Sequence, residues 1–175
     1  MARLQRAIDQ FGDFTRKLEQ LFLRTGSGTK IPFDLRTIVE MAVKKQASEN
    51  HTISFQGGSS FGDFDVELVM EAVSAGLKNA REAMRNGGEV QVRLDQCSEG
   101  GKTFHLVEIK DFGPGLTPAE MENIFEPFRS LQKRGNLVGL GFCTIGAAIK
   151  LHQGFLEFES EPGQGSVLKL GFLQS

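Results

Sequence analysis

The chain has 175 residues, of which 39% are hydrophobic and 24% charged, with a formal net charge of -2 at pH 7. This composition suits one globular domain with an appended helix, and it lacks the basic excess that general nucleic-acid binding requires. Two cysteines that form no CxxC pair, and the lack of any apolar run near the ~20 residues that span a bilayer, argue against a disulfide framework, a structural zinc site and a membrane-spanning segment in this sequence.

The first element that the sequence predicts is an amphipathic helix over residues 2–24. Its apolar residues recur at three- and four-residue spacing among charged ones. They are Leu4, Ile8, Phe11, Phe14, Leu18, Leu21 and Leu23. A Gly/Ser-rich stretch at 25–29 ends the pattern. We therefore divide the chain into a helix with its linker, residues 1–28, and a main domain, residues 29–175, and the apolar stripe offers a surface for dimerisation.

The main domain begins with two helices separated by a short strand. Asp34 is a plausible N-cap for a helix from Leu35 to about Ala47. A strand over 53–55 follows, and then a long helix from about 65 to 85 with an apolar stripe. Two strands, 89–94 and 104–110, come next and are predicted to pair across a loop at 96–102.

The last third of the chain combines a short helix, a loop, a longer helix and a hairpin. Thr117 with Glu120 forms a capping box. A helix over about 140–151 follows, and strands at 155–159 and 167–172 form a hairpin. This order predicts an α+β fold: a two-layer α/β sandwich whose mixed sheet is covered on one face by helices.

The strand that ends in Asp111 carries the strongest functional signal. Period-2 alternation places this carboxylate on the same face as Val107 and Ile109. An unpaired carboxylate facing a core is costly unless a polar partner docks there, and Gly113 and Gly115 allow backbone to approach a ligand closely. The pattern indicates a purine pocket, with an ordinary Asp-Gly turn as the alternative.

Two further features point to an anion and a metal. Asn79 lies one position off the apolar stripe of the long helix, where its carboxamide can bind Mg²⁺ or phosphate, although a solvated helical Asn is the commoner case. Gly139 and Gly141 stand at the start of the helix 140–151, whose free N–H groups attract anions. Glycine before a helix is common, so this second signal is weak alone.

Four motifs occur in a fixed order: Leu77–Ala80, Asp111–Gly115, Phe125–Phe128 and Gly139–Gly141. They resemble the N, G1, F and G2 boxes of the catalytic ATP-binding domain of bacterial sensor histidine kinases, within the wider ATPase group of gyrase, heat-shock protein 90 and mismatch-repair proteins. Pro32-Phe-Asp-Leu after the N-terminal helix resembles the exit from a dimerisation hairpin. The resemblance covers nearly the whole chain and implies the Bergerat sandwich, with residues 1–28 as the end of a dimerisation helix.

The resemblance implies a role for each motif residue. Asn79 would be the catalytic residue that holds Mg²⁺ on the phosphates of ATP. Asp111 would accept a hydrogen bond from the adenine amino group, and Gly113 and Gly115 would line the base. The remaining implied nucleotide contacts are the G2 residues Gly139, Leu140 and Gly141 and the lid residues Phe125, Phe128, Lys133 and Arg134.

Two departures from the family pattern bear on the chemistry. Ala75 stands four residues before Asn79, where histidine kinases often have a second Asn and the hydrolytic relatives a Glu that activates water. Glu71 is eight residues from Asn79, about 12 Å along a helix, and cannot easily replace it. Leu137 occupies the position where the first glycine of the G2 box is usual, and the lid at 129–138 is short.

None of the three histidines matches the family's phosphoacceptor motif. His51 lies in a predicted loop, His105 on the strand before Asp111, and His152 at a helix end, as a cap or surface residue. The resemblance therefore implies a cytoplasmic catalytic fragment whose partners are a histidine-bearing dimerisation domain and a response regulator. It leaves open whether the longer protein is membrane-anchored. The alternatives are a degenerate, partner-binding module and, less favoured, an anti-sigma-type serine kinase.

Overall fold

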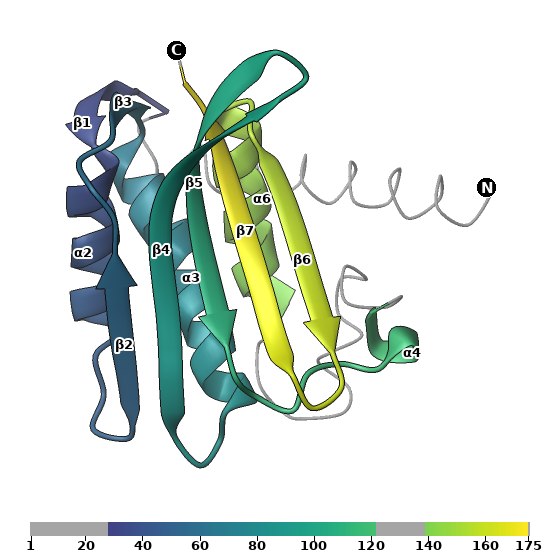
Figure 1. The fold of residues 1–175 in the computed structure, drawn as a ribbon. Coiled ribbons are helices and arrows are strands. Elements are labelled where there is room, and N and C mark those ends of the chain that lie inside the picture. Colours follow the sequence, from purple (N-terminus) through teal and green to yellow (C-terminus); the bar gives the residue numbers. More distant parts are fainter. Residues whose placement is uncertain (1–27, 122–138, 175) are drawn as a thin grey trace.

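The computed structural model describes residues 28–121 and 139–174. A five-stranded sheet with the order β2-β4-β5-β7-β6 forms one layer. Helices α2 (Leu35–Lys45), α3 (Val66–Ala83) and α6 (Gly139–Leu151) lie together on one face of it (Figure 1). The predicted two-layer sandwich is confirmed.

The sheet is mixed, as predicted. Its strands are β2 (His51–Gln56), β4 (Gly88–Glu99), β5 (Lys102–Asp111), β6 (Phe155–Glu161) and β7 (Gly165–Leu173). The β2–β4 pair is parallel, and the other pairs are antiparallel. A short helix, α4 (Pro118–Met121), follows β5. No helix in the described ranges is long and apolar enough to cross a membrane.

Two strands were not expected from the sequence. β1 (Ile31–Asp34) and β3 (Phe61–Phe64) pair antiparallel as a separate ribbon beside α2. Each has only four residues, and their partners are about 30 positions apart, so no local pattern announces the pairing. The ribbon closes one end of the core, where Phe64 is fully buried.

The hairpin between β4 and β5 corrects the loop that was predicted at 96–102. Pairing continues to Glu99 opposite Lys102, so the connection is only Gly100-Gly101. Both glycines have positive φ, +57° and +76°, as a two-residue hairpin turn requires. The prediction failed because the polar residues beyond Leu94 hid the strand.

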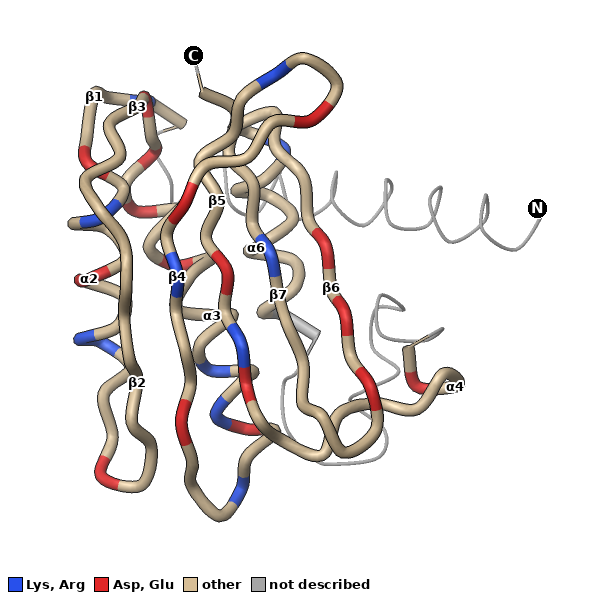
Figure 2. Tube along the Cα trace, viewed as in Figure 1, with Lys and Arg blue, Asp and Glu red and all other residues tan. Residues whose placement is uncertain are grey.

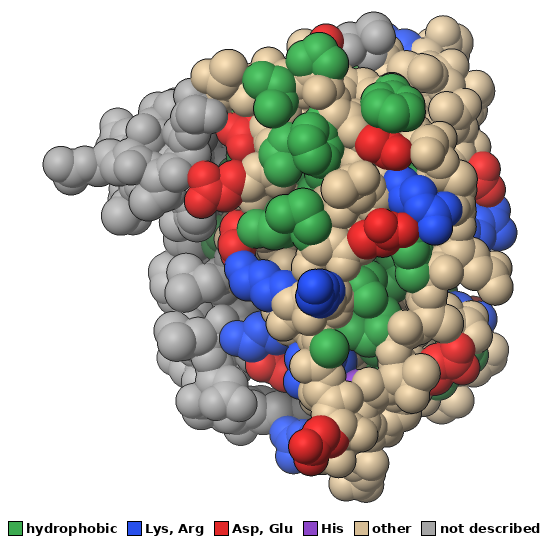
Figure 3. Space-filling model, turned by 90° about the vertical axis from the view of Figure 1, so that its left-hand side faces the viewer, with side chains coloured by type: hydrophobic (Ala, Val, Ile, Leu, Met, Phe, Trp, Pro, Cys, Tyr) green, Lys and Arg blue, Asp and Glu red, His purple; other side chains and the backbone are tan. Residues whose placement is uncertain are grey.

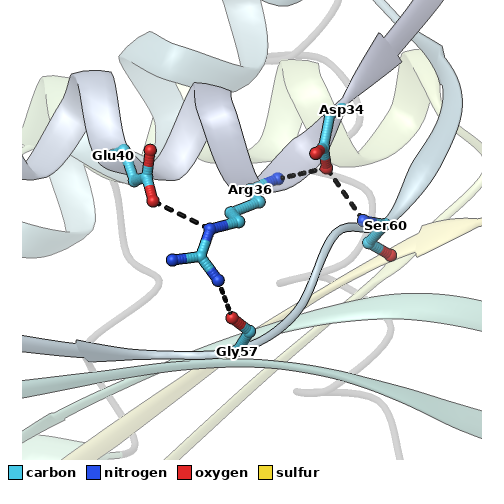
Figure 4. Close-up of polar contacts among 5 residues, drawn as sticks. All are labelled: Asp34, Arg36, Glu40, Gly57 and Ser60. Atoms are coloured by element: carbon cyan, nitrogen blue, oxygen red, sulfur yellow. Dashed lines mark hydrogen bonds and ion pairs between the residues drawn. The ribbon is translucent and has the colours of Figure 1, made fainter.

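Asp34 joins the start of α2 to the loop after β2 (Figure 4). Its Oδ1 accepts from the backbone N–H of Arg36 at 3.0 Å and of Ser60 at 2.8 Å, which confirms the predicted N-cap. The Arg36 side chain donates to Glu40 at 2.8 Å and to the Gly57 carbonyl. These bonds tie the first turn of α2 to the loop between β2 and β3.

The outer surfaces carry charges of both signs. Figure 2 shows acidic and basic residues interspersed along the strands, and Lys169 lies between Glu157 at 3.3 Å and Glu159 at 2.7 Å. On the side that bears α2, exposed hydrophobic side chains gather toward the ribbon end (Figure 3), and Phe61 is 70% exposed. Neither surface contains the residues of the predicted site.

Helix α3 lies at the centre of the core and fixes the site against the sheet. A Cβ at Gly76 would come within 2.8 Å of both Ile109 on β5 and Leu168 on β7. Glycine at this position therefore lets α3 approach the two central strands. The last turns of α3 are thereby placed beside the end of β5, where Asp111 lies.

Candidate functional site

Asp111 is the last residue of β5 and is buried, with 5% of its surface exposed. It pairs with Val90 on β4 and Ser166 on β7, so strands flank it on both sides. Its Oδ1 accepts from the Gly113 N–H at 2.9 Å. Burial raises the pKa of this carboxyl, and hydrogen bonds from Gly113 and Ser166 oppose that rise. The predicted core-facing carboxylate is confirmed.

The glycine loop after Asp111 is packed on two sides. A Cβ at Gly113 would lie 2.9 Å from Asp111 Oδ1 and 3.4 Å from Ala83 and Met84 at the end of α3. Gly115 has φ +65°, and a Cβ there would lie 1.9 Å from the Glu161 carbonyl oxygen in the β6–β7 turn. Larger residues would force this loop away from α3 or from the hairpin.

Asn79 lies four residues before Ala83 on α3, about 6 Å along the same face of the helix. Its Nδ2 is buried and has no hydrogen-bond partner in the described part of the chain. A Cβ at Gly141 would lie 3.4 Å from both side-chain polar atoms of Asn79 and 3.6 Å from the Ala75 Cβ. The structure thus brings the N-box and G2-box residues into contact, with an unpaired amide between them.

The start of α6 adds a favourable site for an anion beside that amide. α6 begins at Gly139, and its first N–H groups have no partners within the helix. The positive end of the helix dipole lies there too. A helix N-terminus alone does not make a site, but the buried, unpaired Asn79 amide is a second and independent indication of a polar ligand.

The chemistry of the donor set fits a metal held mainly by a ligand. The described residues contain no group of three or more His, Cys, Asp or Glu that could hold a metal ion. The Asn79 carboxamide oxygen could give one ligand, so phosphate and water oxygens would have to complete the octahedron of Mg²⁺. Glu71 forms an ion pair with Lys45 and Ala75 carries no polar group, so neither of these two residues supplies a base beside Asn79.

Four predicted residues are outside what the structure describes, and two basic residues on α3 near Asn79 contact other groups. Phe125, Phe128, Lys133 and Arg134 fall outside the described residues. Lys78 forms an ion pair with Glu82 at 3.8 Å. Arg81 donates to the Gln46 carbonyl at 2.8 Å, so the contacts of this guanidinium are with the end of α2.

His152 was predicted to cap a helix or lie at the surface. The surface alternative is wrong, because the side chain is 2% exposed, whereas its contact with a carbonyl of the last turn of α6 fits a cap. Its Nδ1 is 2.7 Å from the Ala148 carbonyl, and its Nε2 accepts from the Asp65 N–H at 3.0 Å, so the ring is neutral with Nδ1 protonated. Only the fold brings the end of α6 to the start of α3.

The sequence prediction missed Ser160 and Ser166 as site residues. Ser166 contacts Asp111 through backbone and side chain, and Ser160 accepts from the Leu116 N–H at 2.9 Å. The segment Ser160–Ser166 was interpreted only as a hairpin turn. The contribution of these two serines to the site can be recognised only from the strand register, which places Ser166 opposite both Asp111 and Ser160.

Comparison with known proteins gives a consistent picture. A family model described as histidine kinase-, DNA gyrase B-, and HSP90-like ATPase matches residues 64–174. Sensor kinase CckA of Brucella abortus is 30% identical over 123 residues, which are 64% of this chain and 12% of that protein. Sensory histidine kinase/phosphatase NtrB of Rhodobacter capsulatus is 36% identical over 97 residues, which are 50% of this chain and 27% of that protein.

The fold also matches a solved structure. The mycobacterial sensor histidine kinase MprB superimposes with a TM-score of 0.69 at 22% identity, over 82% of this chain and 97% of that one. At this identity the likeness shows the fold. The family match, in contrast, includes the segments that carry Asn79, Asp111 and Gly141.

Proposed function

The chain belongs to the family of histidine kinase-, DNA gyrase B-, and HSP90-like ATPases, and from this premise we propose that it is the ATP-binding catalytic domain of a sensor histidine kinase. Curated relatives that it matches are sensor kinases, and it spans 12% and 27% of the two named above. The kinase activity, the acceptor and the partners of the whole protein therefore belong to the proposal. The observation that carries it is the pair of polar groups on α3 and β5: the unpaired Asn79 amide and the buried Asp111 carboxylate.

Asp111 reads the base in this proposal. A carboxylate has two oxygens with about four lone pairs, so the bonds from Gly113 and Ser166 leave acceptor capacity for the adenine amino group. Guanine carries a carbonyl oxygen at that position, which a carboxylate repels. Gly113 and Gly115 let the loop that follows Asp111 lie close against the end of α3 and the β6–β7 hairpin, which larger residues would prevent.

Asn79 and the first turn of α6 hold the phosphates. Mg²⁺ bound with ATP would neutralise phosphate charge, and the Asn79 carboxamide oxygen would orient it. The free N–H groups of Gly139, Leu140 and Gly141 would donate to phosphate oxygens. Catalysis is then positioning and charge neutralisation, the terms that dominate phosphoryl transfer. We assign Phe125, Phe128, Lys133 and Arg134 to the lid on the family pattern.

The acceptor histidine lies outside this chain in the proposal. His105 and His152 are 1% and 2% exposed, so neither can attack a γ-phosphate without unfolding. His51 Nε2 contacts the Met84 carbonyl at 2.9 Å and Nδ1 contacts Ser48 at 3.2 Å. A dimerisation domain supplies the histidine, residues 1–28 end that domain and contribute to the dimer, and a response regulator takes the phosphoryl group.

The test is incubation with γ-labelled ATP and Mg²⁺, with and without a separate dimerisation-hairpin fragment from the parent kinase. We expect label on the fragment, none on this chain alone, and negligible phosphate release because Ala75 offers no water base. Acid-labile label on His51, His105 or His152 would contradict the missing acceptor. Lack of any heat or thermal shift with millimolar Mg-ATP would favour the partner-binding module.

A further inference from the structure

The β6–β7 hairpin and the loop after Asp111 are joined through one hydroxyl group. Ser160 Oγ accepts from the Leu116 N–H at 2.9 Å and lies 2.9 Å from the Gly165 carbonyl oxygen, to which it donates. The Gly163 N–H donates to the Pro114 carbonyl at 2.7 Å, so the two segments run side by side (Figure 1). Among these contacts, those of the Ser160 hydroxyl continue through a further hydrogen bond toward Asp111.

That path continues through Ser166. The two hydroxyl oxygens of Ser160 and Ser166 are 3.0 Å apart. Ser166 lies opposite Asp111 in the β5–β7 register, and hydrogen bonds from its side chain and backbone oppose the rise in the pKa of that carboxyl. A hydroxyl has a single proton, and the Ser166 hydroxyl proton is donated to the Asp111 carboxylate, the stronger acceptor. The proton of Ser160 is therefore shared between Gly165 O and Ser166 Oγ.

The contacts form one continuous path, from the Leu116 N–H through the Ser160 and Ser166 hydroxyls to the Asp111 carboxylate. Bonds in such a chain polarise one another, so each strengthens the next. The same chain ties the loop to the hairpin on which Ser166 stands. The orientation of the Asp111 carboxylate and the position of the loop are consequently set by one side chain on β6.

We propose that Ser160 is a positioning residue for base recognition: its hydroxyl orients Ser166 and the loop after Asp111 so that the carboxylate presents its remaining acceptor to the exocyclic amino group of adenine. The inference rests on the proposed function. It goes further by assigning a role to a residue outside the four motifs and to the hairpin that carries it.

The experiment compares two ligands: Mg-ATP and Mg-purine riboside triphosphate, which differs from ATP by lacking the exocyclic amino group. Calorimetry gives the ratio of their dissociation constants. We expect the wild-type protein to prefer ATP, and Ser160→Ala to reduce that preference about two- to tenfold. Affinity for the purine analogue should change little, because the phosphate end is intact. Ser160→Thr keeps the hydroxyl and should restore the preference.

Two further variants make the result decisive. Ser160→Cys keeps about the same side-chain volume with a weaker hydrogen-bond donor and should also reduce the preference for ATP over the purine analogue. This variant tests the proposal if Ser160→Ala does not fold. Ser54→Ala removes a different hydroxyl, which donates to Glu89 where β2 pairs with β4, and should leave the ratio unchanged.

The possible failures are distinguishable. An unchanged ratio in Ser160→Ala and Ser160→Cys, or a loss that Ser160→Thr does not restore, would overturn the positioning role. A wild-type protein that binds both triphosphates equally would instead contradict Asp111 as the base reader and thus the proposed function. Thermal melts of every variant identify those that fold.

Discussion

Asp111 and Asn79 stand at the two ends of the proposed site, and their polar atoms are in opposite states. Asp111 lies between β4 and β7 and already has hydrogen bonds from Gly113 and Ser166. Asn79 lies between two helices, and its buried Nδ2 has no partner in the described part of the chain. The carboxylate at one end already has hydrogen-bond donors from the protein, whereas the amide at the other end has none among the described residues.

The difference teaches how binding energy would be divided. Strands that pair on both sides hold the base end rigid, so recognition of adenine needs little ordering. An unpaired buried amide costs free energy that a ligand can recover, so the phosphate end gains most when phosphate and metal are present. We therefore expect substitutions at the base end to affect every adenine nucleotide and those at the phosphate end to affect binding that depends on Mg²⁺.

Gly115→Ala should give the largest effect, because it displaces the loop that follows Asp111 at the base end of the site. The added Cβ would lie 1.9 Å from the Glu161 carbonyl oxygen, and φ is +65°. Together these should cost about 2–5 kcal/mol in stability and abolish detectable ADP binding. Gly163→Ala is the matched control: it has φ +79° but nothing within 4 Å of the added Cβ, so only the conformational cost remains. Equal losses of ADP affinity in both would contradict the steric argument.

Asp111→Asn should weaken ATP and ADP alike by about 1–3 kcal/mol and reduce the preference over guanine nucleotides. Calorimetry at pH 7, with and without Mg²⁺, measures this loss. A folded variant with unchanged ATP affinity would place the base elsewhere.

Although Asp111→Asn should weaken nucleotide binding, it should raise the stability of the free protein. Burial raises the folded-state pKa of Asp111 above its ordinary 3.8, so the contribution of this carboxyl to stability is full below pH 3.8 and is lost as the pH rises through the raised value. Asp111→Asn removes that loss, so we expect a higher Tm than wild type at pH 7 and a shrinking difference toward acid pH. A lower Tm at pH 7 would show that the carboxylate stabilises the empty site.

Asn79→Ala tests the phosphate end of the site. It should weaken the binding free energy by a smaller amount, about 0.5–1.5 kcal/mol, and only for binding that needs Mg²⁺. Calorimetry should find Mg-ATP affinity reduced and metal-free ADP affinity unchanged. The free protein should be at least as stable as wild type, since the lost amide has no hydrogen-bond partner in the described part of the chain and its burial costs free energy. An equal loss of metal-free ADP binding would remove the distinction between the two ends.

The smallest effect on the site should come from mild acid. Burial lowers the pKa values of His105 and His152, which lie 5.3 Å and 5.9 Å from the Phe64 ring, between centroids. Their neutral forms stabilise the fold at pH values above the ordinary histidine pKa of 6.5, and this contribution is lost as the pH falls below 6.5. The charged groups that act on His152 are Asp65 and Lys30. Melts from pH 7 to 5 should show a falling Tm in wild type and a shallower fall in His152→Gln, while ATP affinity at pH 6 matches that at pH 7.

Much of the domain could be predicted because its signals are local. Asp34 and Asp65 bond the first turns of α2 and α3, and Thr117 and Glu120 bond each other as a capping box, within three residues along the chain. The two-residue period that places Asp111 in the core is likewise a property of neighbouring residues. Each of these interactions needs only the segment that carries it. The lid roles of Phe125, Phe128, Lys133 and Arg134 stay predictions.

Other features required the chain to close on itself. The β1–β3 ribbon, the burial of His152 and the contact of Gly141 with Asn79 join residues from about 30 to nearly 90 positions apart. No local pattern encodes such pairings, because which segments meet depends on how the whole sheet and its helices pack. By itself the sequence determined the helices and most strands of the main sheet, the Asp34 cap, the Thr117–Glu120 capping box and the inward face of Asp111. Only the tertiary structure decided that Ser160 and Ser166 would lie beside that carboxylate, and that the buried Asn79 amide would meet no hydrogen-bond partner among the described residues.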